Sequence, residues 1–303
     1  MTVPPSQRGA ALLTVLLLVA VMATMSATAL DRIGVATRLA ANVTTIAQAR
    51  AWLGTAELLA AARIEDLLAA DQAQTTLAGG WLGVERSIAL PDGAIVRARV
   101  EDGGNCFNLN GLVERQPDGR LAERPRGREH FANLMTLLGI APGEAERIAS
   151  SAADYIDSGM MADASELRAV AGVTPRHYAI LERWVCALPT DQPAAVNVNT
   201  LLVEQAPLLA MLAPEVVDVA RARAQLSARP ADGYGSVLQF WNAPALRGLE
   251  IPEAVAQQVQ VRTSFFTLRA VVGAGDVEVQ ESALIDARAT PARIIRRQWG
   301  EAG

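Results

Sequence analysis

The N-terminal sequence that organises this chain is Gln7-Arg8-Gly9 followed by AALLTVLLLVAVMATMSATAL, residues 10–30. These 21 residues carry no charged side chain, and as an α-helix they would extend about 31 Å. The hydrocarbon core of a bilayer is roughly 30 Å thick, so the segment is long enough to cross a membrane. Arg8 marks the cytoplasmic flank, which predicts that the rest of the chain is exported.

The helical pattern continues past residue 30 as an amphipathic stretch that reaches about Gln74. No proline occurs between Gln7 and Leu90, so we expect one very long helix, half in a membrane and half packed on a soluble domain. The apolar side chains at three- and four-residue spacing are Val43, Ile46, Ala49, Leu53, Ala56, Ala60, Ile64 and Leu67. Those expected on the other faces are Arg50, Glu57, Arg63, Glu65 and Asp66.

Strand patterns occur in two separate parts of the chain, and each contains a turn sequence rich in glycine. About 150 residues between them have a helical pattern, with prolines where a first helical turn accepts them. The sequence therefore predicts an all-α domain inserted into a sheet. The predicted strands are Val84–Leu90 and Ala94–Val100 around Pro91-Asp92-Gly93, then Ser264–Val272 and Val277–Ile285 around Gly273–Asp276, and Arg293–Trp299.

Composition and motifs argue against an enzyme or a nucleic-acid-binding protein. The net charge of −5 does not suit nucleic acid as the main partner. The chain has no G-x-S-x-G, H-E-x-x-H, P-loop or C-x-x-C motif. We expect His130 and His177 at the surface, and the charged segment Glu114–His130 as a solvated, mobile loop.

The chain has two cysteines, Cys106 and Cys186. Export would place them in a compartment where disulfides persist, which favours a Cys106–Cys186 bridge that pins the inserted domain to the sheet. The alternative is two unconnected buried thiols. Two cysteines without a C-x-x-C motif do not indicate a zinc site.

The leader Met1–Gly9 and the apolar helix after it resemble a type IV prepilin. The resemblance implies that a prepilin peptidase cuts between Gly9 and Ala10 and N-methylates Ala10. Most family members have glutamate at the fifth mature position, where this chain has Thr14; a subunit at the filament tip, with no subunit ahead, has no use for that carboxylate. Two alternatives remain: a signal peptide cleaved after Ala27-Thr28-Ala29, and a plain membrane anchor.

Four further pieces resemble minor pseudopilin K of the type II secretion system, the GspK family. They are NCFNLNGL at 105–112, DYID at 154–157, ELRAVAGV at 166–173 and VNVNT at 196–200. The resemblance implies an α+β fold in which a long N-terminal helix packs on an antiparallel, pilin-like sheet with a large all-α domain inserted between strands. The expected boundaries are 1–9 for the leader, 10–30 for the transmembrane and filament-core helix, 31–106 for the amphipathic helix and first strands, 107–262 for the insertion, and 263–303 for the remaining strands.

The resemblance implies a minor pseudopilin that caps the periplasmic pseudopilus and initiates its assembly for protein export. Its expected partners are I- and J-type minor pseudopilins, the major pseudopilin and the prepilin peptidase. The expected location is the bacterial inner membrane, crossed once, with the C-terminal domain in the periplasm. Alternatives are a minor pilin of a type IV pilus, and a membrane-anchored DNA-binding protein that uses helix-hairpin-helix units.

Two features of the insertion bear on ligands. Members of the family often continue the D-x-x-D segment with an acidic, calcium-binding loop, which in this chain is reduced to Asp163 and Glu166. The resemblance makes Asp154, Asp157, Asp163 and Glu166 candidate calcium ligands; the alternative is that Asp163 caps a helix and the other acids are exposed. Leu167–Val173 and Val196–Arg223 resemble helix-hairpin-helix units. Gly172 fits the turn of the first unit, whereas Glu215 in the second would repel a phosphate, so we expect packing modules and no nucleic acid.

Overall fold

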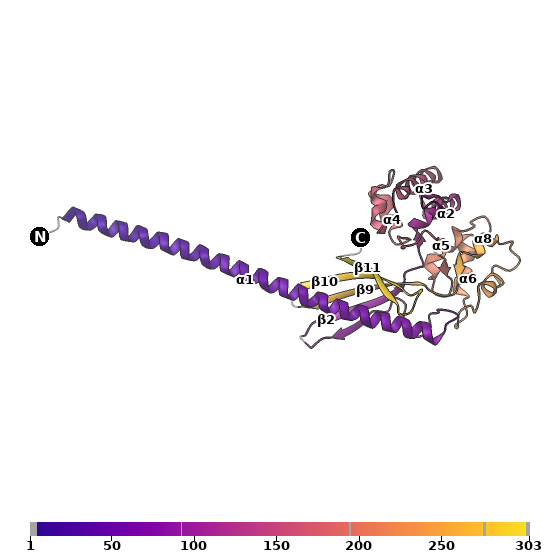
Figure 1. Cartoon of the computed structure of the whole chain (residues 1–303), viewed down its shortest axis with the longest axis horizontal. Helices are drawn as coiled ribbons and strands as arrows, with labels where there is room; N and C mark the ends of the chain where they lie inside the picture. The colour runs from indigo at the N-terminus through magenta and orange to yellow at the C-terminus, as the bar shows by residue number, and fades with distance from the viewer. Residues whose placement is uncertain (1–4, 92, 194, 275–276, 301–303) are drawn as a thin grey trace.

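The computed structural model describes residues 5–91, 93–193, 195–274 and 277–300, without the side chains of 5–11, 157 and 274. Its longest element is helix α1 (Pro5–Ala70), with 66 residues. The first part of this helix projects far from the rest of the chain (Figure 1). The prediction of one continuous helix is confirmed, and the absence of proline explains why its hydrogen-bond ladder is not interrupted.

A five-stranded antiparallel sheet packs on the C-terminal part of α1, in the order β1-β2-β9-β10-β11. Strand patterns in both parts of the sequence are confirmed. The turn after β1 is closed by a 2.9 Å bond from Leu90 N to Ala94 O, and Gly93 has a φ of 84°, which favours glycine. Asp92 and residues 275–276 of the predicted turns lie outside the described residues. The strands are β1 (Arg86–Ala89), β2 (Ile95–Asp102), β9 (Phe265–Ala274), β10 (Val277–Asp286) and β11 (Arg293–Trp299).

The core between α1 and the sheet begins at Ala49. Here the predicted apolar stripe is confirmed, whereas Val43 is 63% exposed because the helix has already left the sheet at that point. The expectation that Glu57 lies on an exposed face is wrong: its side chain is buried against the sheet and pairs with Arg297. The buried residues of this core are Ala49, Leu53, Ala56, Ala60, Ile64, Leu68, Ala94, Val96, Phe266, Leu268, Ala270, Val272, Ala283, Ile285 and Ala287.

Residues 103–264, hereafter the helical body, are inserted between two neighbouring strands. Asp102 at the end of β2 stands opposite Phe266 near the start of β9. The chain leaves the sheet through Gly103, whose N–H donates to Phe265 O at 2.9 Å. A Cβ atom on Gly103 would lie 2.8 Å from Thr267 Oγ1, so glycine permits this close approach of the two ends of the insertion.

The helical body has its own hydrophobic core, separate from the one under α1. Its largest fully buried side chains include Phe131, Phe240 and Leu134. Three two-stranded ladders that the sequence analysis did not anticipate accompany the predicted helices: β3–β6, β4–β5 and β7–β8. The α-helices are α2 (Pro125–Leu137), α3 (Pro142–Asp157), α4 (Pro175–Leu181), α5 (Ala206–Ala210), α6 (Val219–Ser227), α7 (Val237–Trp241) and α8 (Glu253–Ala256), with 3-10 helices η1 (Leu109–Leu112), η2 (Ala164–Ala169) and η3 (Val203–Gln205). The short strands are β3 (Phe107–Asn108), β4 (Val113–Arg115), β5 (Leu121–Glu123), β6 (Val185–Cys186), β7 (Val196–Asn197) and β8 (Val259–Gln260).

The expectation of a mobile loop over 114–130 is wrong. Strands β4 and β5 pair in this segment, and α2 begins at Pro125. Several of its charged residues form ion pairs; for example, Arg128 contacts Glu123 at 2.7 Å and Glu146 at 3.0 Å. The alternating charges therefore hold a hairpin and a helix start together.

The three parts of the molecule follow one another along its long axis (Figure 1). The projecting part of α1 carries the N-terminus at one end, and the sheet lies alongside the second half of the same helix. The helical body lies at the end of the molecule opposite the N-terminus. Because of this order, the projecting part of α1 is left free for partners, whereas the opposite end of the molecule is occupied by the helical body.

Candidate functional site

The first candidate site is the exposed part of α1, residues 12–45, hereafter the stem. Its large apolar side chains, from Leu12 to Val43, are between 48% and 69% exposed. Among the described residues, α1 is the helix long and apolar enough to cross a membrane, and none of its apolar window is buried by the rest of the chain. Such a surface requires a lipid or a protein partner, because a monomeric soluble protein rarely exposes so large an apolar patch.

The predicted processing residues belong to this helix. Gly9 and Ala10 lie within α1, although their side chains are outside the described set. Thr14 lies on the exposed stem. No described residue supplies a carboxylate in the apolar run before Asp31, so the stem carries no buried negative charge that would need a partner amine.

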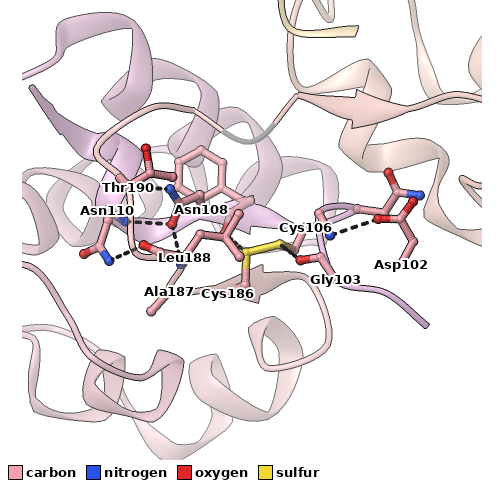
Figure 2. The surroundings of a disulfide bond; sticks show 12 residues. Asp102, Gly103, Cys106, Asn108, Asn110, Cys186, Ala187, Leu188 and Thr190 are labelled. Atoms are coloured by element: carbon pink, nitrogen blue, oxygen red, sulfur yellow. Dashed lines mark hydrogen bonds between the residues drawn. A yellow bond between two sulfur atoms is a disulfide. The ribbon is translucent and has the colours of Figure 1, made fainter. Parts of the chain in front are cut away.

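The second candidate site is the junction between sheet and helical body, where the chain leaves β2 and returns to β9. A disulfide joins Cys106 to Cys186, 80 residues apart (Figure 2). The predicted bridge is therefore confirmed. Cys186 is a residue of β6 in the parallel β3–β6 ladder, and Cys106 directly precedes β3. Both cysteines belong to the helical body, so the bridge ties the start of this body to a segment that follows α4 and, contrary to expectation, does not pin the body to the sheet.

The NCFNLNGL piece contributes two buried asparagines that fasten this ladder (Figure 2). Asn108 accepts a bond from Leu188 N and donates to Thr190 O, both at 2.9 Å. Asn110 accepts a bond from Met161 N at 2.8 Å and donates to Leu188 O at 2.9 Å. Every one of these partners is a backbone group in another segment. The asparagine side chains therefore satisfy backbone hydrogen-bonding groups that regular helices or strands would satisfy elsewhere.

The VNVNT piece joins the helical body to the sheet and to the end of α1. Asn197 N donates to Asn105 Oδ1 at 2.8 Å, and Asn105 Nδ2 donates to Thr200 Oγ1 at 3.0 Å. The Asn197 side chain donates to Thr75 O at 3.2 Å and to Thr263 Oγ1 at 2.9 Å. One asparagine thereby connects the segment after α1, the helical body and the approach to β9.

Asp102 is the charged centre of this network. Its Oδ1 accepts a bond from Gly104 N at 2.9 Å, and its Oδ2 accepts bonds from the hydroxyls of Thr200, at 2.5 Å, and Thr263. Desolvation raises the pKa of Asp102, although each of these hydrogen bonds opposes the shift. Asp102 belongs to no sequence motif; the signal that marks it is its position as the last residue of a strand, just before two glycines.

The candidate calcium ligands are not arranged as an assembled cation site. Asp154 is exposed, and the side chain of Asp157 lies outside the described set. Asp163 Oδ1 accepts a bond from Ser165 N at 2.8 Å, and Glu166 Oε1 accepts bonds from Ala162 N and Asp163 N at 2.7 and 3.0 Å, which form a capping box on η2. Burial acts to raise the pKa of the Asp163 carboxyl, but the hydrogen bonds from Ser165 act in the opposite direction, and the net result is a lowered pKa.

Among the described side chains, no group of three or more histidine, cysteine, aspartate or glutamate residues is positioned to hold a metal. The backbone amides at η2 already use the two carboxylates that calcium would need from this segment. Calcium binding by these residues stays a prediction.

The helix-hairpin-helix resemblance corresponds to packing elements. Gly172 adopts the expected left-handed turn conformation, with a φ of 87°. Next to it, the Arg168 guanidinium lies 4.1 Å from the ring centroid of Tyr178 and so stacks within the chain. Glu215 is exposed at the turn before α6, where a phosphate would meet its negative charge. These contacts do not favour nucleic acid as a partner.

The two histidines are not surface residues, contrary to expectation. His130 is buried in α2, and desolvation lowers its pKa. His177 is buried at the start of α4, where its Nδ1 accepts a bond from Thr174 N at 3.2 Å while Thr174 Oγ1 accepts from His177 N. His177 thus completes a helix cap, a role in which imidazole replaces the usual carboxylate or amide.

Replacing both cysteines by alanine should lower the free energy of unfolding by roughly 4 kcal/mol, because the bridge closes a long loop in the unfolded chain. Denaturant unfolding of the full chain in detergent, without reductant, measures the difference. Reductant should destabilise the wild-type protein but leave the double variant unchanged. A loss below about 1 kcal/mol would show that the asparagine network alone secures the junction.

Two family models described as type II secretion system protein K match, one at residues 196–262 and the other at residues 105–160 and 158–190. The protein K of Klebsiella pneumoniae is 30% identical over 319 residues, covering 97% of each chain. That of Dickeya chrysanthemi is 28% identical over 348 residues, again covering 97% of each.

A solved structure is also similar, the crystal structure of the GspK-GspI-GspJ complex from the enterotoxigenic Escherichia coli type 2 secretion system. The match has a TM-score of 0.71 and 28% identity, and it covers 84% of this chain and 96% of that chain. These matches do not favour a type IV pilus subunit or a DNA-binding receptor. By its sequence over nearly its whole length and by its fold, the chain belongs to the protein K family of the type II secretion system, a family of minor pseudopilins.

Proposed function

We propose that this chain is made as a membrane-anchored precursor, is cut between Gly9 and Ala10, and then closes the tip of a periplasmic pseudopilus. The stem would hold the precursor in the inner membrane and would later pack among other stems inside the filament. Membrane anchoring is supported by a charge-free run of residues that is long enough to cross a bilayer. The apolar side chains of this run are not buried by the rest of the chain. The prepilin peptidase would methylate the new N-terminus at Ala10.

The proposal that this chain caps the pseudopilus rests on the position of its helical body. A pseudopilin filament grows by stacking subunits whose stems run along its axis, so a subunit placed ahead of this one would need the end opposite the N-terminus. That end is covered by residues 103–264 (Figure 1). The stem supports the same conclusion, because Thr14 provides no carboxylate for a terminal amine ahead of it.

A groove beside α1 supports partnership with other pseudopilins. It has a volume of about 530 Å³ and lies between α1 and β1, with Leu59, Val84 and Ile88 each 45% to 50% exposed along it. The charged residues that line it are all arginines, namely Arg63, Arg86 and Arg99. We infer that it receives an apolar helix flanked by carboxylates.

A second copy of this chain is a poor occupant for this groove. Its stem carries Arg32 and Arg38 against one acid, Asp31, and like charges would meet at the rim. The related GspK was crystallised together with GspI and GspJ. We therefore propose I- and J-type minor pseudopilins as the partners, with the major pseudopilin below them in the filament.

The processing step predicts the mass of the mature protein. The chain purified from cells with an active prepilin peptidase should begin at Ala10 and carry one additional methyl group. Cells without the peptidase should yield a protein that retains residues 1–9. Intact-mass spectrometry distinguishes these products, and a mature protein that begins at Leu30 would instead establish the signal-peptide alternative.

Removing the helical body should abolish capping. Residues 104–263 can be replaced by a two-residue glycine linker, because β2 and β9 are antiparallel neighbours that a hairpin would join. Electron microscopy should then show longer pseudopili than with the wild-type chain. Raising the expression of the wild-type chain should have the opposite effect and shorten them, which tests the proposal even if the deleted protein is unstable. Unchanged lengths in both experiments would refute capping.

The groove predicts that a charge reversal weakens the tip complex. Changing Arg63→Glu and Arg86→Glu together should lower the recovery of co-expressed I- and J-type pseudopilins with the full chain by roughly tenfold, which corresponds to about 1.4 kcal/mol. Arg126→Glu, an exposed site on the helical body, is the matched control and should leave recovery unchanged. Equal recovery with both variants would exclude this groove as the contact surface.

A further inference from the structure

Two acidic side chains meet inside the contact between α1 and the sheet. Glu57 projects from α1 and Glu281 from β10, and their exposed fractions are 3% and 4%. On β10, Ala283 lies on the same face as Glu281 and stands opposite Arg297, the partner of Glu57, so Glu281 lies beside the Glu57–Arg297 contact. Two carboxyl groups in such a place can share a hydrogen bond only when one of them holds a proton, because an ionised carboxylate has no donor.

One guanidinium serves this pair. Arg297 of β11 binds Glu57 with both ends of its fork, Nε to Oε1 at 2.6 Å and Nη2 to Oε2 at 2.8 Å. This bidentate contact assigns the negative charge to Glu57. Oε1 of Glu281 is buried and has no hydrogen-bond partner among the described residues. Two buried acids therefore face one base, whose own side chain is half exposed.

Among the residues that the structure describes, the surrounding elements provide no second base for Glu281. On β9, Ala270 stands opposite Glu281, and the neighbouring Arg269 points to the other face of the sheet, where it pairs with Glu101. On β11, the residue opposite is Trp299, and Arg50 of α1 lies over its ring at 5.0 Å. Glu57 is the acid that faces Glu281 from α1, and Arg297 is the base that faces it from β11.

We infer that α1 is held to the sheet by a proton-dependent clamp, in which a proton between Glu281 and Glu57 joins the helix to β10 while Arg297 joins it to β11. Loss of that proton would place two negative charges in contact in a buried site and weaken the attachment of the stem. The clamp lies eight residues beyond Ala49, where the helix first meets the sheet, so it acts on the part of α1 that carries the stem.

Desolvation, the hydrogen bond with Glu57 and the charge of Glu57 together raise the pKa of Glu281 to about 7, against the opposing effect of Arg297. The folded protein therefore binds more protons at this site than the unfolded chain does. Stability from this group is complete below the ordinary glutamate pKa of about 4.5 and is lost as the pH rises towards about 7.

The test is thermal unfolding of the full chain in detergent at pH values from about 5 to about 8. Glu281→Gln keeps the shape of the protonated acid and donates to Glu57 at every pH. Relative to this variant, the wild-type melting temperature should fall over the range by an amount on the order of 5 °C. Glu278→Gln is the matched control, since Glu278 lies on the same strand but is half exposed and pairs with Arg97; its pH dependence should equal that of wild type.

The difference between wild type and Glu281→Gln is the diagnostic quantity, because two other buried groups titrate in both proteins. Burial lowers the pKa of His130, which gives the opposite slope, and burial raises the pKa of Asp102, which gives the same slope. Parallel melting curves for wild type and Glu281→Gln, or a variant less stable than wild type at about pH 8, would overturn the clamp.

Hydrogen exchange of the wild-type chain locates the effect without any substitution. After correction for the intrinsic exchange rate, amides of α1 around Glu57 and of β10 around Glu281 should exchange faster at about pH 8 than at about pH 5. Amides of α3 in the helical body should not change. Equal protection of both α1 and β10 at the two pH values would count against the inference.

Discussion

The buried contact between α1 and the sheet is the constraint on which the molecule depends. A single helix has to satisfy two environments, because one face of it is buried against the sheet from Ala49 onward, whereas its stem is exposed on all sides. The apolar stem gains nothing from the fold of this chain, so the attachment rests on the small stripe from Ala49 to Leu68 and on the Glu57–Arg297 pair. Alanine at three positions of the stripe lets the helix approach the strands closely, which compensates for its narrow width.

The insertion imposes the second constraint, because a large body can enter a sheet only where two neighbouring strands accept both of its ends. Gly103 allows this approach, and the polar network around Asp102 and Asn197 secures it. Polar side chains suit this place, since short irregular segments leave backbone groups that need partners. A fully satisfied network also fixes one orientation of the segments, as an apolar contact of the same area would not. The disulfide adds a covalent limit at the same point.

Much of the architecture could be predicted from local patterns. The long helix, the strands on both sides of the insertion and the helical character between them follow from periodicities of 3.6 and 2 residues and from turn residues such as Gly93. The cysteine pairing followed from composition and compartment. The two-residue ladders β3–β6 and β7–β8 could not be predicted, because such short strands have no periodicity to detect. The segment 114–130 was misjudged because alternating charges suit a salt-bridged hairpin as well as a solvated loop.

The uncovered stem, its length, and the order of helix, sheet, insertion and sheet can be inferred from the residue order, because each depends on residues that are neighbours in the chain. The burial of Glu57 beside Glu281 and Arg297, more than 200 residues away, is visible only in the folded chain. The same holds for the groove between α1 and β1 and for the joining of Thr75 to Asn197. The physical reason is that the environment of a charge depends on which distant strands close around it, and helix periodicity assigns a face without saying what will cover it.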